Sequence, residues 1–149
     1  YHHHMGTVIE TQEDTERLME STHDSVKLTL DTGHMLFAKG DSKKIFENFS
    51  GRLQHVHCKD IRKNVLEKSL KEDLSFREAF LEGAFTVPGD GCIDYMPLFE
   101  ILKKNNYSGW LVVEAEQDPK KANPLEYAIK GYKYLTETLN KSDIKIDIK

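Results

Sequence analysis

Apolar and polar positions alternate in short runs along the chain, and each run is followed by a stretch with helical spacing. Residues 26–31, 52–60 and 110–116 alternate with a period of two, which is typical of β-strands that bury one face. We expect residues 1–7 to form a short opening strand as well. Strands separated by helices cannot pair as hairpins, so they should lie parallel with right-handed crossovers. The pattern therefore predicts an α/β fold built from four consecutive βα units.

Residues that favour helix ends mark where the predicted helices begin. Thr11, with Asp14 three residues later, resembles a capping box, and Asp41 is placed to cap a second helix. Residues 96–102 have the apolar spacing of a third helix, and Pro124 suits the first turn of a last one. Each helix follows one predicted strand, so strands and helices alternate along the chain.

A long insertion, residues 61–93, separates the predicted strand 52–60 from the helix that follows it. It has helical spacing of its own and ends in Pro88-Gly89-Asp90-Gly91, a turn by residue type. Insertions after the carboxyl end of a strand lie over the ligand face of such folds, so we interpret 61–93 as a lid-like insertion. The alternative is a surface pair of helices without that role. Residues 141–149 form a tail whose alternating isoleucines fit either an edge strand or a frayed end.

Length and composition limit the class of protein. With 149 residues the chain is one domain by length, and it is too short for a complete eight-stranded α/β barrel of about 250 residues. Its apolar runs are far shorter than the roughly 20 residues that span a bilayer, so we expect no membrane segment. The net charge is −4 and no basic stripe is present, which argues against nucleic acid as a partner. Cys58 and Cys92, without an apolar signal segment, favour a reducing cytoplasm.

The polar faces of the predicted strands carry the candidate chemistry. Asp31, His57 and Glu114 lie on the polar faces of three successive strands, and His2 and His4 share one side of the opening strand. Burying so many ionisable groups in one interior costs roughly several kcal/mol each unless they pair or bind a cation. Two carboxylates and an imidazole suit Mn, Co, Fe or Zn in an open coordination shell. The alternative is that these are unrelated strand-end residues in salt bridges.

A second imidazole follows the first of these strands in the sequence Asp31-Thr32-Gly33-His34. Gly33 is expected to free the backbone for a tight bend. His34 is compatible with three roles, namely a metal ligand, an acid or base, and a neighbour of a helix cap.

Five segments together resemble the inosose dehydratase family of the xylose-isomerase-like sugar isomerase/epimerase barrels. They are Tyr1–Thr7, Asp31–His34, His55–Asp60, Val87–Asp94 and Trp110–Pro119. The resemblance extends to about Leu139, and it implies that residues 1–140 form the C-terminal half of a TIM barrel, with about four parallel strands and the first four absent.

The resemblance also implies a divalent metal, held by glutamate, aspartate, histidine and glutamate on successive strands. Asp31, His57 and Glu114 match the last three, whereas His2 stands where the first glutamate is expected. The fourth ligand is therefore open among His2, His4 and a residue upstream of this sequence. The family implies Co or Mn, with Zn also compatible, and it implies glutathione as an accessory requirement for which the sequence has no recognisable binding motif.

The reaction implied by the resemblance is the removal of water from 2-keto-myo-inositol, a cyclic polyol ketone, in myo-inositol catabolism. Such chemistry needs an electrophile, a base and a proton donor for the departing hydroxide. The candidate catalytic residues are His34, Lys59 and His4. The candidate substrate-binding residues are His34, Lys59, Asp60, Arg62 and Glu116, of which Glu116 is also a reserve ligand or base.

Three other hypotheses fit the same sequence. The first is a metal-binding half barrel without turnover. The second is an isomerase or epimerase of the same superfamily, which returns the proton to the substrate instead of expelling water. The third is a noncatalytic sugar-binding module. Only the module predicts that Asp31→Ala leaves ligand affinity intact. Because a half barrel exposes two sheet edges, we expect a homo-oligomer or a missing N-terminal half as its partner.

Overall fold

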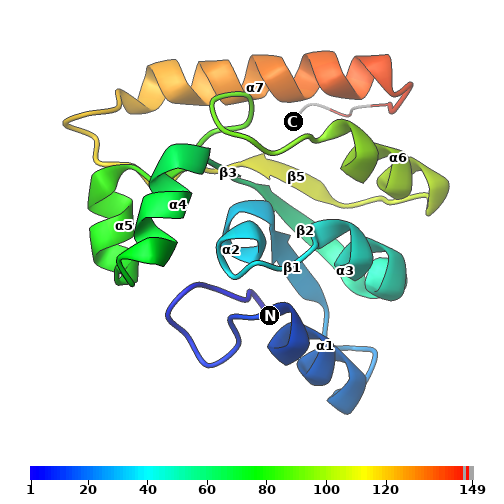
Figure 1. Ribbon diagram of the computed structural model, residues 1–149. Coiled ribbons are helices and arrows are strands. Elements are labelled where there is room, and N and C mark those ends of the chain that lie inside the picture. Colours follow the sequence, from blue (N-terminus) through cyan, green and yellow to red (C-terminus); the bar gives the residue numbers. More distant parts are fainter. Residues whose placement is uncertain (146, 148–149) are drawn as a thin grey trace.

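Three parallel strands form the central sheet of the computed structural model, which describes residues 1–145 and 147 (Figure 1). Their order is β1 (Leu28–Asp31), β2 (Leu53–Cys58) and β5 (Trp110–Val113). Both neighbouring pairs are parallel, as the alternation of strands and helices predicted. The α/β class with a parallel sheet is therefore confirmed.

Helices and short elements complete the chain. The helices are α1 (Gln12–Ser21), α2 (Thr32–Phe37), α3 (Ser42–Phe49), α4 (Lys63–Lys71), α5 (Phe76–Glu82), α6 (Met96–Lys104) and α7 (Pro124–Lys141), and the shorter elements are the 3₁₀ turn η1 (Ser50–Arg52) and the strands β3 (Asp60–Ile61) and β4 (Phe85–Thr86). Throughout the described residues, none of the helices combines the length and the apolar character that crossing a membrane requires.

The helices begin where the capping residues predicted. Thr11 and Asp14 form the capping box of α1, and the side chain of Asp41 accepts the amide of Lys43 at the start of α3. Pro124 is the first residue of α7. Local side-chain bonds of this kind depend on nearby sequence alone, which is why the sequence located them.

The opening segment is less strand-like than predicted. His2 pairs with Thr29 as a single parallel bridge, and the amide of His4 then donates to the carbonyl of Ile9 in a turn. The prediction of a strand over residues 1–7 is therefore wrong in extent, because this turn ends the pairing after one residue. The predicted tail strand falls partly on residues 146, 148 and 149, which lie outside the described residues.

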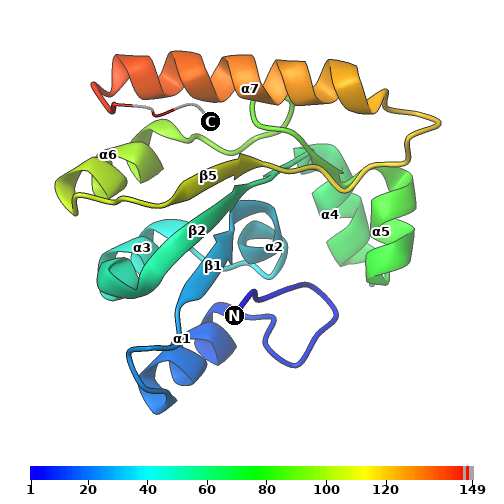
Figure 2. The same ribbon diagram turned by 180° about the vertical axis from the view of Figure 1, so that it is seen from behind.

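Apolar side chains fill one face of the sheet and leave the other face to polar residues. Helices α2 and α3 lie on the same side of β1 and β2 in both views (Figures 1 and 2). The larger apolar cluster on this side includes Leu28, Leu30, Val56, Cys58, Met35, Ile45, Phe46 and Phe99. The side chains of Thr29, His55 and His57 alternate with these strand residues and are half-buried on the other face. The polar face is thus free for a functional site.

The side chain of Asp60 joins the last turn of the insertion to β3, which pairs with β4. Its carboxylate is fully buried and accepts the amides of Ile61, Gly89, Gly91 and Ile93 at 2.8–3.2 Å. A Cβ at Gly91 would overlap this carboxylate, so the turn needs glycine there. The turn between β4 and α6 is therefore fastened to β3 by one side chain.

We predict that Asp60→Ala lowers the free energy of unfolding by about 3 kcal/mol, because it removes four hydrogen bonds to a carboxylate and leaves the amide of buried Ile61 unpaired. Urea titration followed by circular dichroism measures the change. Asp24→Ala is the matched control, since Asp24 is 89% exposed and lies 3.9 Å from Arg52, and it should change the value by less than about 0.5 kcal/mol. Equal effects of the two substitutions would contradict the role given to Asp60.

Candidate metal centre

Strand register brings the three predicted ligands together. Asp31 at the end of β1 pairs with His57 in β2, and His57 pairs with Val112 in β5, two residues before Glu114. Residues in register, and residues two apart, point to one face of a sheet. His57 Nδ1 lies 3.6 Å from Asp31 Oδ2 and 2.6 Å from Glu114 Oε2, and the three ligand atoms all lie within 4.8 Å of one another.

His2 approaches the same place from the other side of β1. Its Nε2 lies 3.6 Å from Asp31 Oδ2, and its ring centroid lies 4.7 Å from that of His57. We call His2, Asp31, His57 and Glu114 the first cluster. Of the two candidates for the fourth ligand within this chain, His2 contacts Asp31 of this cluster and also forms a group with Asp31 and His34, whereas His4 forms a group with His34 and Glu116.

One buried atom of each residue in the first cluster has no hydrogen-bond partner. These atoms are His2 Nε2, Asp31 Oδ2, His57 Nδ1 and Glu114 Oε2. Folded proteins rarely leave buried polar atoms unpaired, and two nitrogens with two carboxylate oxygens are a donor set that divalent transition metals take. The short contact between His57 and Glu114 does not have hydrogen-bond angles. The residues present therefore fit a divalent metal ion.

Two hydrogen bonds, one to the backbone amide of Asp31 and one to its Oδ1, hold this residue in place. Asp31 Oδ1 accepts the amide of His34 at 2.9 Å as the N-cap of α2, and the Asp31 amide donates to His3 Nε2 at 3.1 Å. His3 is fully buried, and burial lowers its pKa to about 3, so its ring is neutral. Asp31 Oδ2 takes no part in these contacts and faces His2, His57 and Lys59.

The charges of the first cluster act on one another strongly. The carboxylates of Asp31 and Glu114 raise the pKa of His57 to about 9. Burial disfavours the charged form of Asp31, but the imidazoles of His2 and His57 and the ammonium of Lys59 outweigh it, so its pKa lies well below the usual range. The aspartate is thus an anion ready to bind a cation.

A second cluster of ligand-type residues consists of His4, His34 and Glu116, whose ligand atoms also lie within 4.8 Å of one another. Glu116 Oε2 lies 3.1 Å from His34 Nε2, and Glu116 Oε1 lies 3.3 Å from His4 Nε2. The rings of His4 and His34 stack with centroids 3.7 Å apart. Burial opposes ionisation of Glu116, yet His34 and Lys59 outweigh it and lower its pKa to about 2.

Lys59 lies between the two clusters and is fully buried. Its Nζ donates to Glu116 Oε2 at 2.7 Å, contacts His34 Nε2 at 3.0 Å, and lies 3.1 Å from Asp31 Oδ2 and 3.5 Å from Glu114 Oε2. Burial alone would lower the pKa of Lys59, but the surrounding carboxylates raise it above its usual value. The predicted catalytic residues His4, His34 and Lys59 are therefore neighbours of the predicted ligands.

Gly33 does not form the predicted tight bend but makes room for the side chain of Lys59. It lies inside α2, where a Cβ would come within 2.9 Å of Cγ of Lys59. Glycine is needed because the lysine side chain crosses the helix at this point, and a larger residue would displace it. The prediction of a bend at Gly33 is wrong because the helix begins directly after the strand.

Two of the predicted substrate contacts face elsewhere. The Asp60 carboxylate is occupied by the four backbone amides described above. Arg62 Nη1 donates to the carbonyl of Gly83 at 2.7 Å, and its Nη2 donates to Asp90 Oδ2 at 2.6 Å. Both side chains hold the insertion in place, and the assignment of Asp60 and Arg62 to substrate stays a prediction.

The insertion supplies aromatic neighbours that the sequence did not single out for the site. Phe85 lies 5.0 Å from the ring of His34, and Phe76 lies 5.0 Å from the ring of His4. The apolar spacing of residues 61–93 indicated that these side chains pack somewhere, but not against which partner. They cover the second cluster on one side.

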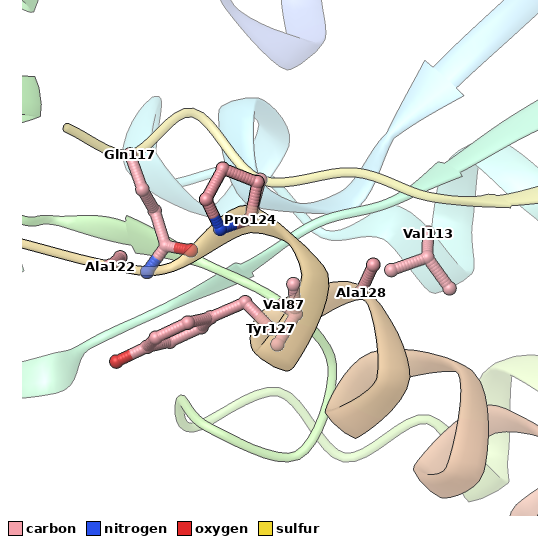
Figure 3. A pocket seen from close by; sticks show the side chains of 8 residues that line it. Val87, Val113, Gln117, Ala122, Pro124, Tyr127 and Ala128 are labelled. Carbon is pink, nitrogen blue, oxygen red and sulfur yellow. The ribbon is translucent and has the colours of Figure 1, made fainter. Parts of the chain in front are cut away.

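A separate pocket of about 160 Å³ lies where β5 ends beside the start of α7 (Figure 3). Its lining residues are Val87, Val113, Ala115, Gln117, Ala122, Pro124, Tyr127 and Ala128. None of these is charged, and none belongs to either cluster. Both clusters therefore lie outside this pocket.

Known relatives match nearly the whole chain. The inosose dehydratases of Clostridium beijerinckii and Bacillus licheniformis are 53% and 51% identical to it over 138 and 140 residues. These alignments cover 92% and 93% of this chain but 46% and 47% of the relatives. The chain thus spans about half the length of the curated relatives it matches.

Solved structures and a family comparison agree on the fold. The crystal structure of IolI protein with a zinc atom has a TM-score of 0.64 over 90% of this chain and 45% of its own, at 20% identity. That of the probable 3-DHS dehydratase AsbF from Bacillus anthracis has a TM-score of 0.65 over 91% and 47%, at 19% identity. The family model described as xylose isomerase-like TIM barrel matches residues 1–138. The chain therefore belongs to the xylose isomerase-like TIM barrel family.

Proposed function

We propose that this chain forms the metal-binding half of a dehydratase that removes water from 2-keto-myo-inositol. The observation that carries the proposal is the first cluster, where four buried ligand atoms converge without hydrogen-bond partners. Inosose dehydratases at 50–53% identity support the substrate class, a cyclic polyol ketone. Because the chain spans about half of these relatives, the activity is proposed for the assembled barrel.

The first cluster is proposed to hold the ion through Asp31, His57, Glu114 and His2. Manganese or cobalt is the proposed ion, and zinc is the alternative, because all three accept mixed nitrogen and oxygen ligands. When bound, such an ion polarises a carbonyl oxygen and an adjacent hydroxyl. Glutathione remains an expectation from the family resemblance.

The residues of the second cluster and Lys59 are proposed to move the protons. Dehydration transfers a proton from the carbon beside the ketone to a base, while the carbon–oxygen bond breaks and the leaving hydroxide gains a proton to become water. Lys59 is the proposed donor, because its ammonium is held beside carboxylates. His34 and His4 are the candidate acceptors, and Glu116 orients both rings. The 3.0 Å contact between Lys59 and His34 lets a proton return between them.

The insertion 61–93 is proposed to exclude water from this site. Phe76 and Phe85 pack on the rings of His4 and His34. Asp90 fastens the insertion, because it accepts hydrogen bonds from Arg62 and from Lys130 on α7. The lid role thus stays a proposal that these contacts support.

The other half of the barrel is the proposed partner of the open edge of the sheet. A groove of about 540 Å³ runs between β5 and α7, and its lining includes Leu111, Tyr132 and Leu139. The relatives are about twice as long as this chain, so the part they add is the proposed occupant. A second copy of this chain is the alternative, which a mass measurement in solution distinguishes.

We predict that Glu114→Gln weakens Mn²⁺ binding, because it removes a charged ligand. Loss of a residue that only orients a ligand weakens metal affinity by roughly 10–100-fold, and we expect a larger effect here. Calorimetric titration measures the affinity. Glu47→Gln is the control, since Glu47 is exposed on α3, and it should bind Mn²⁺ as the wild type does. Unchanged binding by Glu114→Gln would remove Glu114 from the ligand set.

We predict that the chain, combined with the N-terminal half of the Clostridium beijerinckii relative, converts 2-keto-myo-inositol to a dione in the presence of Mn²⁺ or Co²⁺. Ultraviolet absorbance follows the dione, and Asp31→Ala should abolish it. An epimer without dione would favour the isomerase hypothesis. Metal binding with no product would favour a half barrel without turnover, and substrate binding that survives Asp31→Ala would favour the noncatalytic module.

A further inference from the structure

The first and second clusters lie side by side but differ in how their polar atoms are satisfied. Each contains three histidine and carboxylate side chains whose ligand atoms lie within 4.8 Å of one another, namely Asp31, His57 and Glu114 in the first and His4, His34 and Glu116 in the second. The first cluster contains four buried atoms without hydrogen-bond partners, whereas none of the second cluster's atoms is in that condition. Similar residue types in similar geometry therefore need a cation in one place and not in the other.

Lys59 accounts for the difference. Its ammonium donates to Glu116 and contacts His34 at 3.0 Å, which are the distances of hydrogen bonds rather than of metal coordination. It is fully buried, so these contacts replace its hydration. The second cluster thus already contains a positive charge, the ammonium of a lysine that directly follows β2.

The charges balance with one lysine and one divalent ion. Asp31, Glu114 and Glu116 bring three carboxylates within 3.5 Å of Lys59 Nζ. The ammonium neutralises one of these charges, and a divalent ion in the first cluster neutralises the other two once His57 has released its proton to bind it. A second divalent ion beside the lysine would leave uncompensated positive charge in a buried site, which is strongly unfavourable.

We propose that Lys59 takes the place of the second cation of a two-cation centre and so limits the site to one divalent ion. Without the lysine side chain, the second cluster becomes a site for a second Mn²⁺ or Co²⁺. Asp31 is the shared ligand, because its Oδ2 lies 3.6 Å from His57 Nδ1 and 3.1 Å from Lys59 Nζ. Paired metal sites share ligands in this way at separations of about 3.5–4 Å. The inference rests on the proposed metal binding by the first cluster.

The experiment counts the Mn²⁺ ions bound by the wild-type chain and by Lys59→Ala, which vacates the position of the ammonium. We expect one ion per chain in the wild type and two in the variant, measured by calorimetry and by metal analysis after desalting. Electron paramagnetic resonance adds an independent readout, because two Mn²⁺ ions at this separation give a spin-coupled spectrum and a single ion does not.

Two further variants separate the role of charge from that of space. Lys59→Met removes the charge but keeps an unbranched apolar side chain of nearly the same length, and it should bind one ion. The double variant Lys59→Ala/Glu116→Ala removes a ligand of the second cluster and should return the count from two to one. Circular dichroism confirms that each variant is folded, and Lys59→Ser replaces Lys59→Ala if the alanine variant is not.

The outcomes distinguish this inference from the proposed function. No ion bound by the wild type would refute the metal site of the proposed function. One ion in the wild type and one in the folded Lys59→Ala variant would refute this inference alone. Two ions in the wild type would also refute it, because the lysine would then not exclude the second ion.

Discussion

The fully buried ammonium of Lys59 is the contact on which the arrangement of both clusters depends. It follows β2 and meets Asp31 at the end of β1 and Glu116 beyond the end of β5. Carboxylates this close together repel one another in a buried site unless a positive charge lies between them. Gly33 leaves room for the lysine stem, so the start of α2 is constrained by the same side chain. One charge thus ties together segments that are distant in the sequence.

The sequence could predict the first cluster because its geometry follows from strand periodicity. Side chains two residues apart share a face, and the carboxyl ends of parallel strands meet at one edge of the sheet. Asp31, His57 and Glu114 could therefore be assigned to one interior before any coordinates existed. The capping box at Thr11 was equally predictable, because it involves only neighbouring residues.

Residues beyond the strand ends could not be placed in this way. Asp60 and Arg62 follow β2 closely, yet their side chains bond to the turn and carbonyls of the insertion, whose path no local pattern encodes. The purpose of Gly33 depends on a lysine 26 positions away, and His3 reaches the Asp31 amide across a segment with a single bridge. Periodicity specifies a face, and long-range packing decides what that face meets.

The candidate metal ligands all lie within this chain, whereas the proposed dehydratase activity needs the complete barrel. The ligand atoms of the first cluster all come from residues 2–114, so this chain alone offers four candidate ligands for the proposed ion. The cover over the second cluster, formed by Phe76 and Phe85, also belongs to this chain. The polar face that carries Thr29 and His55 is only half-buried, because a barrel interior needs strands on every side. The described residues therefore supply charged groups to the proposed site, and the other half of the barrel is proposed to enclose the substrate.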